Sequence, residues 1–475
     1  MRSTVAFVAG SALLAGVLLE GVPLAAAGAG PHTAGPYKVK DLRVVSGPSP
    51  FAAGCPGAFN ALAITGHELE PAITVNPANP RNIVATWKQD VGPALQSRSD
   101  LVASSLDGGK TWTRSTIPGL TTCTGGTADA GSDPWLSAGG DGTVYFSGLA
   151  ADLSTDPPTT AVVASHSPNG GRSWSATATV AAPLAGNEHD AITASPTRAG
   201  HAYLAFANFL DPGALPRTNP VEFSRTTDGG ANWSSPVLID QPGPFAIDFS
   251  PKILVLPDGA LLAVFARADF EAGLGYLYAA RSPDEGRTWL PPVLAVTKPF
   301  PPDAVDDKDI PLPQPGFPSA AVAPDGSVYV AFEDNKSSSS GAIGVARSRD
   351  GGRTWSSAPL PGVSAFAFEP AIAVDSHGTV GVTWYDLRND RPGDAALTAD
   401  VWFAHSSDRG ASWRQTHVAG PTDLRTAPLP AHNYVGEYQG LAALPGRGFA
   451  AIFTMAAPLA KNGPTDIFFT RIGPG

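Results

Sequence analysis

The sequence has little charge and little sulfur. Only 15% of its residues are Asp, Glu, Lys or Arg, and it contains two cysteines and two methionines. The formal net charge is −11 and the Lys and Arg residues form no cluster, which excludes the basic surface that nucleic acids and anionic membranes attract. Beyond its N-terminal segment the chain has no apolar run long enough to cross a bilayer. We therefore expect a soluble protein that binds neither nucleic acid nor membrane.

The N-terminal segment has the organisation of a secretory signal. Arg2 precedes an apolar stretch over residues 5–19, and small residues follow over 25–29. This stretch is short for a membrane span, so a cleaved signal peptide is the better interpretation. We predict a signal peptide over residues 1–29 and a single extracellular domain over residues 30–475.

The two cysteines, Cys55 and Cys123, would then enter an oxidising compartment. A disulfide between them is the default prediction, and two free thiols in separate loops are the alternative.

Glycine and proline are abundant, with 52 and 47 residues, and the chain repeats itself. This composition suits short strands joined by tight turns. Six segments share the pattern Ser/Thr-x-Asp/Asn-x-Gly-x-Thr/Ser/Asn-Trp: Ser105–Trp112, Ser167–Trp174, Thr226–Trp233, Ser282–Trp289, Ser348–Trp355 and Ser406–Trp413.

The chemistry of this motif is that of a turn. Asp and Asn side chains accept hydrogen bonds from nearby backbone N–H groups, and Gly adopts the positive φ that a tight turn needs. The second copy carries Asn169 where the others carry Asp, so an acceptor suffices and a charge is not required. We interpret the motifs as structural turns and look elsewhere for a functional site.

Each motif lies late in a unit of four short strands, which predicts an all-β fold made of propeller blades. Seven opening strands can be counted, beginning near Glu70, Asp133, His189, Ser250, Phe317, Glu369 and Tyr438. The last unit stops before its fourth strand. We predict a β-propeller of seven four-stranded blades, in which the N-terminal segment Lys38–Val45 closes the last blade against Asp466–Ile472. Six blades remain the alternative.

The six motifs resemble those of the sialidase (BNR/Asp-box) superfamily, and the resemblance covers nearly the whole chain after the signal. It implies a propeller, which in sialidases is six-bladed. It also implies a signature Arg-x-x-Pro opening the first blade, three arginines that hold the sialate carboxylate, a Tyr–Glu nucleophile pair and an Asp acid/base. This chain reads Glu68-Leu69-Glu70-Pro71 at the place of that signature, without the Arg. Other Asp-box proteins are glycanases, polysaccharide lyases and non-catalytic binding propellers.

The loops that enter the first strand and leave the second strand of each blade share one face, and the Asp-box turns lie on the other. Carboxylates, phenols and arginines meeting on that first face are what glycoside cleavage requires. The candidate catalytic residues there are Tyr438, Glu437, Asp133, Glu70, Glu369 and Asp386. The candidate substrate-binding residues are Arg267, Arg388, His189 and Asp190. The alternative is that these groups line a solvated channel and pair neighbouring blades.

An acidic loop stands apart from these candidates. It could bind Ca²⁺, or it could be a solvated loop, since no known ligand spacing appears in Asp303, Asp306, Asp307 and Asp309. We expect no other cofactor.

Three functions remain open on the sequence alone. A secreted, monomeric, sialidase-like glycoside hydrolase acting on extracellular glycans ranks first. A non-catalytic propeller that binds a glycan or a protein is the second, and a polysaccharide lyase the third.

Overall fold

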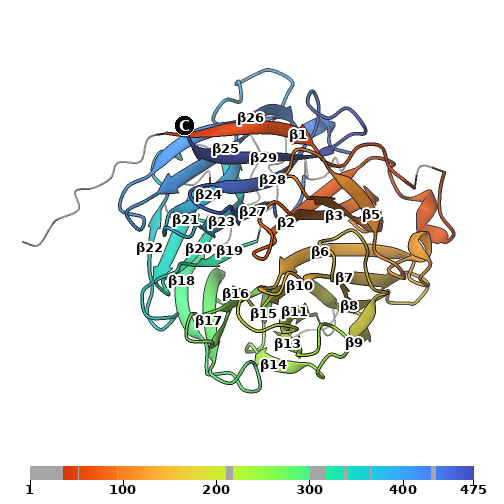
Figure 1. Cartoon of the computed structure of the whole chain (residues 1–475), viewed down its shortest axis with the longest axis horizontal. Helices are drawn as coiled ribbons and strands as arrows, with labels where there is room; N and C mark the ends of the chain where they lie inside the picture. The colour runs from red at the N-terminus through yellow and green to blue at the C-terminus, as the bar shows by residue number, and fades with distance from the viewer. Residues whose placement is uncertain are drawn as a thin grey trace, which may run out of the picture. The chain divides into compact units, whose positions relative to one another are not determined.

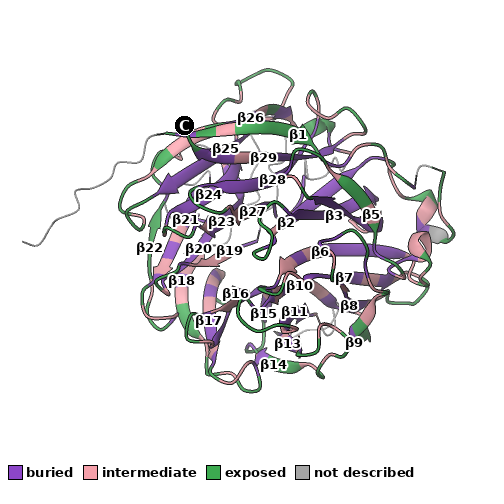
Figure 2. Ribbon diagram, viewed as in Figure 1, coloured by how far each residue is buried: buried purple, intermediate pink, exposed green. Residues whose placement is uncertain are grey.

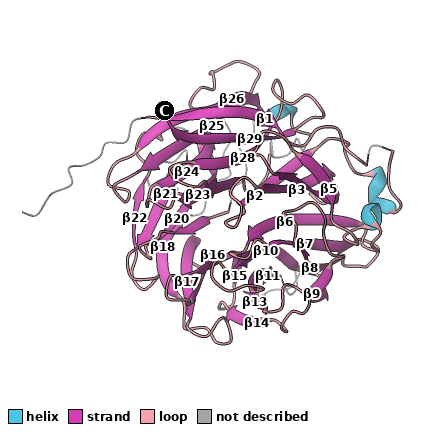
Figure 3. Ribbon diagram, in the orientation of Figure 1, coloured by secondary structure: helices cyan, strands magenta, loops and turns pink. Residues whose placement is uncertain are grey.

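The computed structural model describes residues 36–51, 53–93, 95–209, 218–299, 317–334, 341–363, 366–428 and 435–475, all within one unit, Ala34–Gly475. The predicted signal peptide and the acidic residues between 303 and 309 lie outside the described residues. Helix in the described part is confined to three short 3-10 turns (Figure 3), η1 (Ala58–Ala61), η2 (Thr122–Thr124) and η3 (Leu424–Thr426). The protein is therefore all-β, as the composition predicts.

The strands follow one another in antiparallel groups of four. The first group contains β2 (Glu68–Val75), β3 (Ile83–Val91), β4 (Ser97–Ser105) and β5 (Thr113–Thr116). The second group contains β6 (Ala130–Ala138), β7 (Val144–Asp152), β8 (Thr159–Ser167) and β9 (Ala178–Leu184). One residue pair, Ser97 and Gly131, joins these two groups into one sheet. The third group contains β10 (Asn187–Ala194), β11 (Ala202–Asn208), β13 (Val221–Thr226) and β14 (Val237–Asp240).

The later groups repeat this order. The fourth contains β15 (Ala246–Val255), β16 (Leu261–Asp269), β17 (Leu274–Ser282) and β18 (Val293–Pro299), with the short β12 (Thr218–Asn219) at its edge. The fifth contains β19 (Ser319–Val322), β20 (Val328–Glu333), β21 (Ile343–Ser348) and β22 (Ser356–Pro359). The sixth contains β23 (Ala367–Val374), β24 (Val380–Asp386), β25 (Thr398–Ser406) and β26 (Arg414–Asp423). The seventh contains β27 (Gly440–Ala443), β28 (Phe449–Met455), β29 (Asp466–Pro474) and β1 (Tyr37–Val44).

The first strands of the groups meet around a common centre (Figure 1). Each contacts the first strand of the next group, in the cyclic order β2, β6, β10, β15, β19, β23, β27 and back to β2. This arrangement is consistent with a propeller.

The N-terminal strand closes the last sheet as predicted. β1 pairs antiparallel with β29, with Lys38 opposite Gly473 and Val44 opposite Phe468. Trp112 of the first Asp box packs edge-on against Phe469 of β29, with ring centroids 5.1 Å apart. A Cβ added at Gly109 would lie 2.2 Å from the ring of Phe469, so only glycine allows this approach, and its φ of 87° also favours glycine.

The hydrophobic core lies between neighbouring groups, because each sheet is covered on both faces. Val84 of the first group packs with Val144 and Phe146 of the second. Ile83 packs on the other side with Ile452 of the seventh group. Figure 2 shows that the buried residues concentrate on the inner strands, whereas outer strands such as β1 and β26 carry many exposed residues.

The Asp boxes are turns, as the sequence predicts. In the fifth box, Asp350 accepts hydrogen bonds from the Thr354 N–H at 2.9 Å and from the Ser348 hydroxyl at 2.8 Å. Asn169 accepts the equivalent bond from the Ser173 N–H at 3.0 Å. An uncharged acceptor thus makes the same turn.

Cys55 and Cys123 form the predicted disulfide, with Cα atoms 5.0 Å apart. Disulfides persist in oxidising compartments. No helix among the described residues is long and apolar enough to span a membrane.

Candidate functional site

Five of the first strands contain a β-bulge at the same place. In each, a residue other than glycine has a φ between 49° and 56°, where L-residues are uncommon, and the pairing register shifts around it. Bulges redirect a side chain out of the regular alternation of a strand. The bulged residues are Glu70, Asp133, His189, Ser250 and Glu369. All five are positions at which the sequence predicts a blade to open.

Lys88 of β3 lies among these redirected side chains. Its Nζ atom is 2.8 Å from Glu70 Oε2 and 3.4 Å from Asp133 Oδ1, and all three side chains are almost completely buried. Burial opposes the charge of Lys88, but the carboxylates of Glu70 and Asp133 outweigh it and raise its pKa. A buried ammonium ion therefore holds two carboxylates from neighbouring groups together. We call the side chains around it the Lys88 cluster, whose members are Glu70, Lys88, Asp133, Glu188, His189, Asp190, Glu437 and Tyr438.

Asp133 is held in its ionised form. The His189 N–H donates a hydrogen bond to Asp133 Oδ2 at 3.0 Å, and the Ser132 hydroxyl donates to Oδ1 at 2.7 Å. Burial works against its charge, but Lys88, His189 and these donors together lower the pKa of Asp133.

Two half-buried carboxyls of the cluster have the opposite tendency. Burial, reinforced by the charge of Asp133, raises the pKa of Glu188 to about 8. Burial and then the charges of Glu70 and Asp133 raise the pKa of Glu437. Glu188 therefore carries a proton at neutral pH beside an ionised Asp133.

Aromatic rings form one wall of the cluster. Tyr438 packs edge-on against Trp135 with centroids 5.1 Å apart and stacks on Phe317 at 6.2 Å. Its buried hydroxyl donates to the Pro134 carbonyl at 3.2 Å, and burial raises its pKa. The phenol is thus neutral and engaged with the backbone, and its predicted role as a nucleophile stays a prediction.

A second buried cation lies on this wall. Lys252 Nζ is 3.3 Å from the centroid of the Trp135 ring, which favours the charged form through its π face. Burial lowers the pKa of Lys252 to about 7, opposed by the charges of Asp190 and Asp133.

His189 and Asp190 lie next to each other on β10. The His189 ring packs edge-on against Phe317 at 4.4 Å, and burial lowers its pKa to about 4. Asp190 is buried, and burial followed by the charge of Asp133 raises its pKa. The His189 imidazole is therefore neutral at pH 7.

Glu369 lies apart from Lys88 on β23. In the described part of the chain neither of its buried carboxyl oxygens has a hydrogen-bond partner. Burial and then the charge of Glu333 raise the pKa of Glu369 well above its ordinary value, which favours its protonated form.

The predicted arginines have acidic partners of their own. Arg267 donates to Asp248 Oδ1 at 2.6 Å and to Asp240, and it lies over the ring of Tyr278 at 4.5 Å. Arg388 donates to Asp386 Oδ1 at 2.9 Å and lies 3.9 Å from the centroid of Trp402.

Asp386 is consequently the partner of Arg388 and also accepts a hydrogen bond from Trp384 Nε1 at 2.9 Å. The contacts described above for Arg267, Arg388 and Asp386 thus involve no member of the Lys88 cluster. Six of the ten predicted site residues come together in the cluster: Glu70, Asp133, His189, Asp190, Glu437 and Tyr438.

Three ionisable residues of the site are not among the candidates chosen from the sequence. Lys88 stands in β3, whose other residues are also buried, and a lysine directly after Trp87 in this strand is the signal that could have identified it. Lys252 lies in β15, two residues after the bulged Ser250. Glu188 directly precedes the predicted His189.

In the described residues no group of three or more His, Cys, Asp or Glu side chains is arranged to hold a metal ion. The acidic residues between 303 and 309, for which a solvated loop and Ca²⁺ binding were both open, lie outside the described ranges.

No family model and no curated sequence matches the chain. A protein of unknown function from Dyadobacter fermentans is similar in structure, with a TM-score of 0.52 at 14% identity over 92% of this chain and 99% of that one. An α-L-arabinanase from Penicillium chrysogenum, solved with arabinobiose, has a TM-score of 0.47 at 16% identity over 91% and 98% of the two chains. A sialidase from Streptococcus pneumoniae has a TM-score of 0.47 at 10% identity over 87% and 94%. At 14% identity the likeness to the Dyadobacter fermentans protein concerns the fold alone.

Proposed function

We propose that the protein is a secreted, seven-bladed β-propeller that hydrolyses glycosidic bonds in extracellular glycans at the Lys88 cluster. The seven groups of four strands and the cyclic contacts of their first strands support the blade number. The disulfide and the predicted signal peptide support export.

The observation that carries the hydrolase proposal is the separation of two carboxyl groups in protonation state. The pKa of Glu188 is raised to about 8, whereas the pKa of Asp133 is lowered, and both groups interact with the same buried Lys88. Glycoside hydrolysis requires one protonated carboxyl and one carboxylate on either side of the scissile bond.

In the proposed mechanism Glu188 is the general acid. It is half-buried, which leaves it accessible, and it donates its proton to the leaving-group oxygen. Asp133 remains ionised and stabilises the positive charge that develops on the sugar, or activates the attacking water. Glu437 is the second half-buried carboxyl and is the alternative acid.

The charge of the cluster favours a neutral sugar over sialate. The surroundings already raise the pKa of Glu188, Asp190 and Glu437, so they disfavour negative charge and would also disfavour a sialate carboxylate. Arg267 and Arg388, the predicted clamp for a sialate carboxylate, already pair with Asp248 and Asp386.

Binding without catalysis is the second candidate, because Asp133 and Tyr438 are only 4% and 6% exposed. A polysaccharide lyase requires an arginine beside its Tyr or His base. Arg267 and Arg388 have partners other than Tyr438 and His189, so this arrangement offers the lyase less support.

The test is the release of reducing sugar from a panel of neutral and sialylated glycans by the full chain and two variants. Glu188→Gln should lower kcat/KM by at least about 100-fold, because general acid catalysis contributes about 10²–10⁴-fold. The exposed Glu271→Gln is the matched control and should leave activity unchanged.

Unchanged turnover in Glu188→Gln would contradict the assignment of the acid. Binding of a glycan with no release of sugar from any member of the panel would establish the binding candidate instead.

A further inference from the structure

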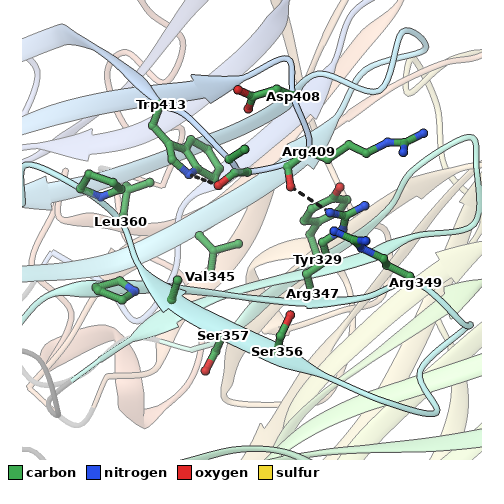
Figure 4. Close-up of a pocket in the computed structure, with 15 residues that line it drawn as sticks. Tyr329, Val345, Arg347, Arg349, Ser356, Ser357, Leu360, Asp408, Arg409 and Trp413 are labelled. Carbon is green, nitrogen blue, oxygen red and sulfur yellow. Dashed lines mark hydrogen bonds between the residues drawn. The ribbon is translucent and has the colours of Figure 1, made fainter.

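A cavity of about 480 Å³ lies among the Asp-box turns of the fifth and sixth groups (Figure 4). Its walls include β22, the turn of the sixth box and the ends of β20 and β21. Three arginines line it, Arg347, Arg349 and Arg409, in a chain whose net charge is −11. We call it the Arg347 crevice.

Arg347 is one of three arginines that have the same place and the same hydrogen bond in their repeats. An arginine directly before the first residue of a box donates to the backbone carbonyl of the residue after the Asp in the next box. Arg225 donates to Glu285 O at 2.7 Å, Arg281 to Gly351 O at 3.1 Å, and Arg347 to Arg409 O at 3.2 Å. The three junctions between groups can therefore be compared position by position.

At the junction of the third and fourth groups a carboxylate neutralises the cations. The Tyr203 hydroxyl donates to Glu285 Oε1 at 3.2 Å, and His201 Nδ1 lies 3.2 Å from the same atom. Arg198 pairs with this carboxylate, and Arg225 Nη1 lies 4.0 Å from it. The protein supplies its own anion here.

At the Arg347 crevice the equivalent position carries the opposite charge. Arg409 takes the place of Glu285, and both adopt the left-handed conformation, with φ of 63° and 59°. Its guanidinium pairs with Asp325 at 3.2 Å. Tyr329 takes the place of Tyr203 and lies beneath Arg347, whose guanidinium carbon is 5.4 Å from its ring centroid.

The other cations of the crevice lack such a partner. Arg347 Nε is buried without a hydrogen-bond partner, and Arg349 is exposed. Across the described ranges neither arginine has a carboxylate within 4.0 Å. Asp408, the one acidic lining residue, already accepts hydrogen bonds from the hydroxyls of Ser406 and Ser412 in its own box.

We propose that the Arg347 crevice binds a sugar that carries an oxyanion, either a carboxylate or a sulfate. The oxyanion takes the place of the Glu285 carboxylate and accepts hydrogen bonds from the Tyr329 hydroxyl and the guanidinium groups of Arg347 and Arg349. This site is separate from the Lys88 cluster and does not rest on the proposed hydrolase activity.

The size and lining of the crevice favour a sugar over a free ion. Its volume is within the range of about 300–1,000 Å³ that is typical of small-molecule sites. Half-exposed Trp413 and the apolar Leu360 line it opposite the arginines (Figure 4), and Pro359 is a further apolar lining residue. Aromatic and apolar side chains provide the contact area that a sugar ring needs.

The test is calorimetric titration of the full chain with glucuronate, glucose 6-sulfate, glucose and inorganic sulfate. One or both charged sugars should bind, glucose should not, and inorganic sulfate should bind at least about 10-fold more weakly. Loss of a charge-assisted hydrogen bond weakens binding by roughly 10- to 100-fold, which is the effect expected for Arg347→Gln.

Arg225→Gln is the matched control, because it removes the same arginine from a junction that has Glu285, and it should leave binding unchanged. Arg409→Glu should abolish binding by restoring an internal carboxylate. If Arg347→Gln fails to fold, which circular dichroism will reveal, the exposed Arg349→Gln replaces it and should also weaken binding.

Three results would overturn the proposal. One is equal binding of glucuronate by the wild type and Arg347→Gln or, where that variant does not fold, Arg349→Gln. Another is binding of glucose as tight as that of the charged sugars. The last is binding of inorganic sulfate as tight as that of the sugars, which identifies an adventitious ion only.

Discussion

Replacing Lys88 by methionine removes the cation of the central cluster while nearly conserving side-chain volume. At an effective dielectric constant of about 20, the 2.8 Å and 3.4 Å contacts correspond to Coulomb attractions of about 6 and 5 kcal/mol. Desolvation of each buried ion offsets several kcal/mol of this attraction. Breaking a buried ion pair on one side typically costs about 3–5 kcal/mol, and we expect that loss for Lys88→Met at pH 7.

The dependence of this loss on pH identifies its cause. In the wild type the folded-state pKa of Asp133 is lowered, so its ionisation stabilises the fold above the unfolded pKa of about 4 and less as the pH falls through the folded pKa. In Lys88→Met burial raises the pKa of Asp133 instead. The variant then loses stability as the pH rises above about 4, and the difference from the wild type is largest at neutral pH.

The assay is urea unfolding followed by tryptophan fluorescence at pH 7 and at pH 4. The exposed Lys110→Met is the control and should unfold like the wild type at both values. The double variant Lys88→Met/Asp133→Asn should recover part of the loss at pH 7, because it removes a buried charge. A loss that is equal at both pH values, or below about 1 kcal/mol at pH 7, would refute the electrostatic account of the cluster.

Further predictions concern the boxes and the proposed chemistry. Trp355→Ala should lower the free energy of unfolding by about 2–4 kcal/mol, since its ring is only partly buried, whereas Asp350→Asn should cost less than about 1 kcal/mol because the second box already uses Asn169. Denaturant unfolding measures both, and a larger loss in Asp350→Asn would contradict the structural role of the box. If Glu188 is the acid, a pH–rate profile should show activity falling as the pH rises through about 8, where Glu188 loses its proton, and a flat alkaline limb would exclude it. If Tyr438 is the nucleophile, Tyr438→Phe should lower kcat strongly and leave the free energy of unfolding unchanged. If its hydroxyl only donates a hydrogen bond to the backbone, the variant should lose about 1 kcal/mol of stability and keep its kcat. Measuring kcat and denaturant unfolding on one preparation separates the two roles.

The parts of the fold that depend on local chemistry could be predicted from the sequence. The box turns follow from an acceptor, a glycine and a hydroxyl at fixed spacing, which the hydrogen bonds of Asp350 and Asn169 confirm. The pairing of β1 with β29 follows from counting strands, since a last unit with three strands needs a fourth from elsewhere. The disulfide follows from two cysteines in a chain with a predicted signal peptide.

The site was predicted less completely because its properties depend on burial and on pairing across groups. Glu70 and Asp133 are recognisable from their place before an opening strand, yet only the packing of neighbouring groups shows that Lys88 joins them. Arg267 and Arg388 have suitable positions in the sequence, but their partners Asp248 and Asp386 become evident only in the folded chain. The sequence also leaves open that the candidates line a solvated channel, whereas Glu70, Asp133 and Tyr438 are buried.

The central claim is that the Lys88 cluster keeps one carboxyl group protonated and another ionised at neutral pH. An NMR titration of the side-chain carboxyl carbons, assigned by Glu188→Gln and Asp133→Asn, measures this directly. We predict that Glu188 titrates near pH 8 and that Asp133 stays ionised to a pH below its ordinary pKa of about 3.9. Titration of both groups together near pH 4 would contradict the account.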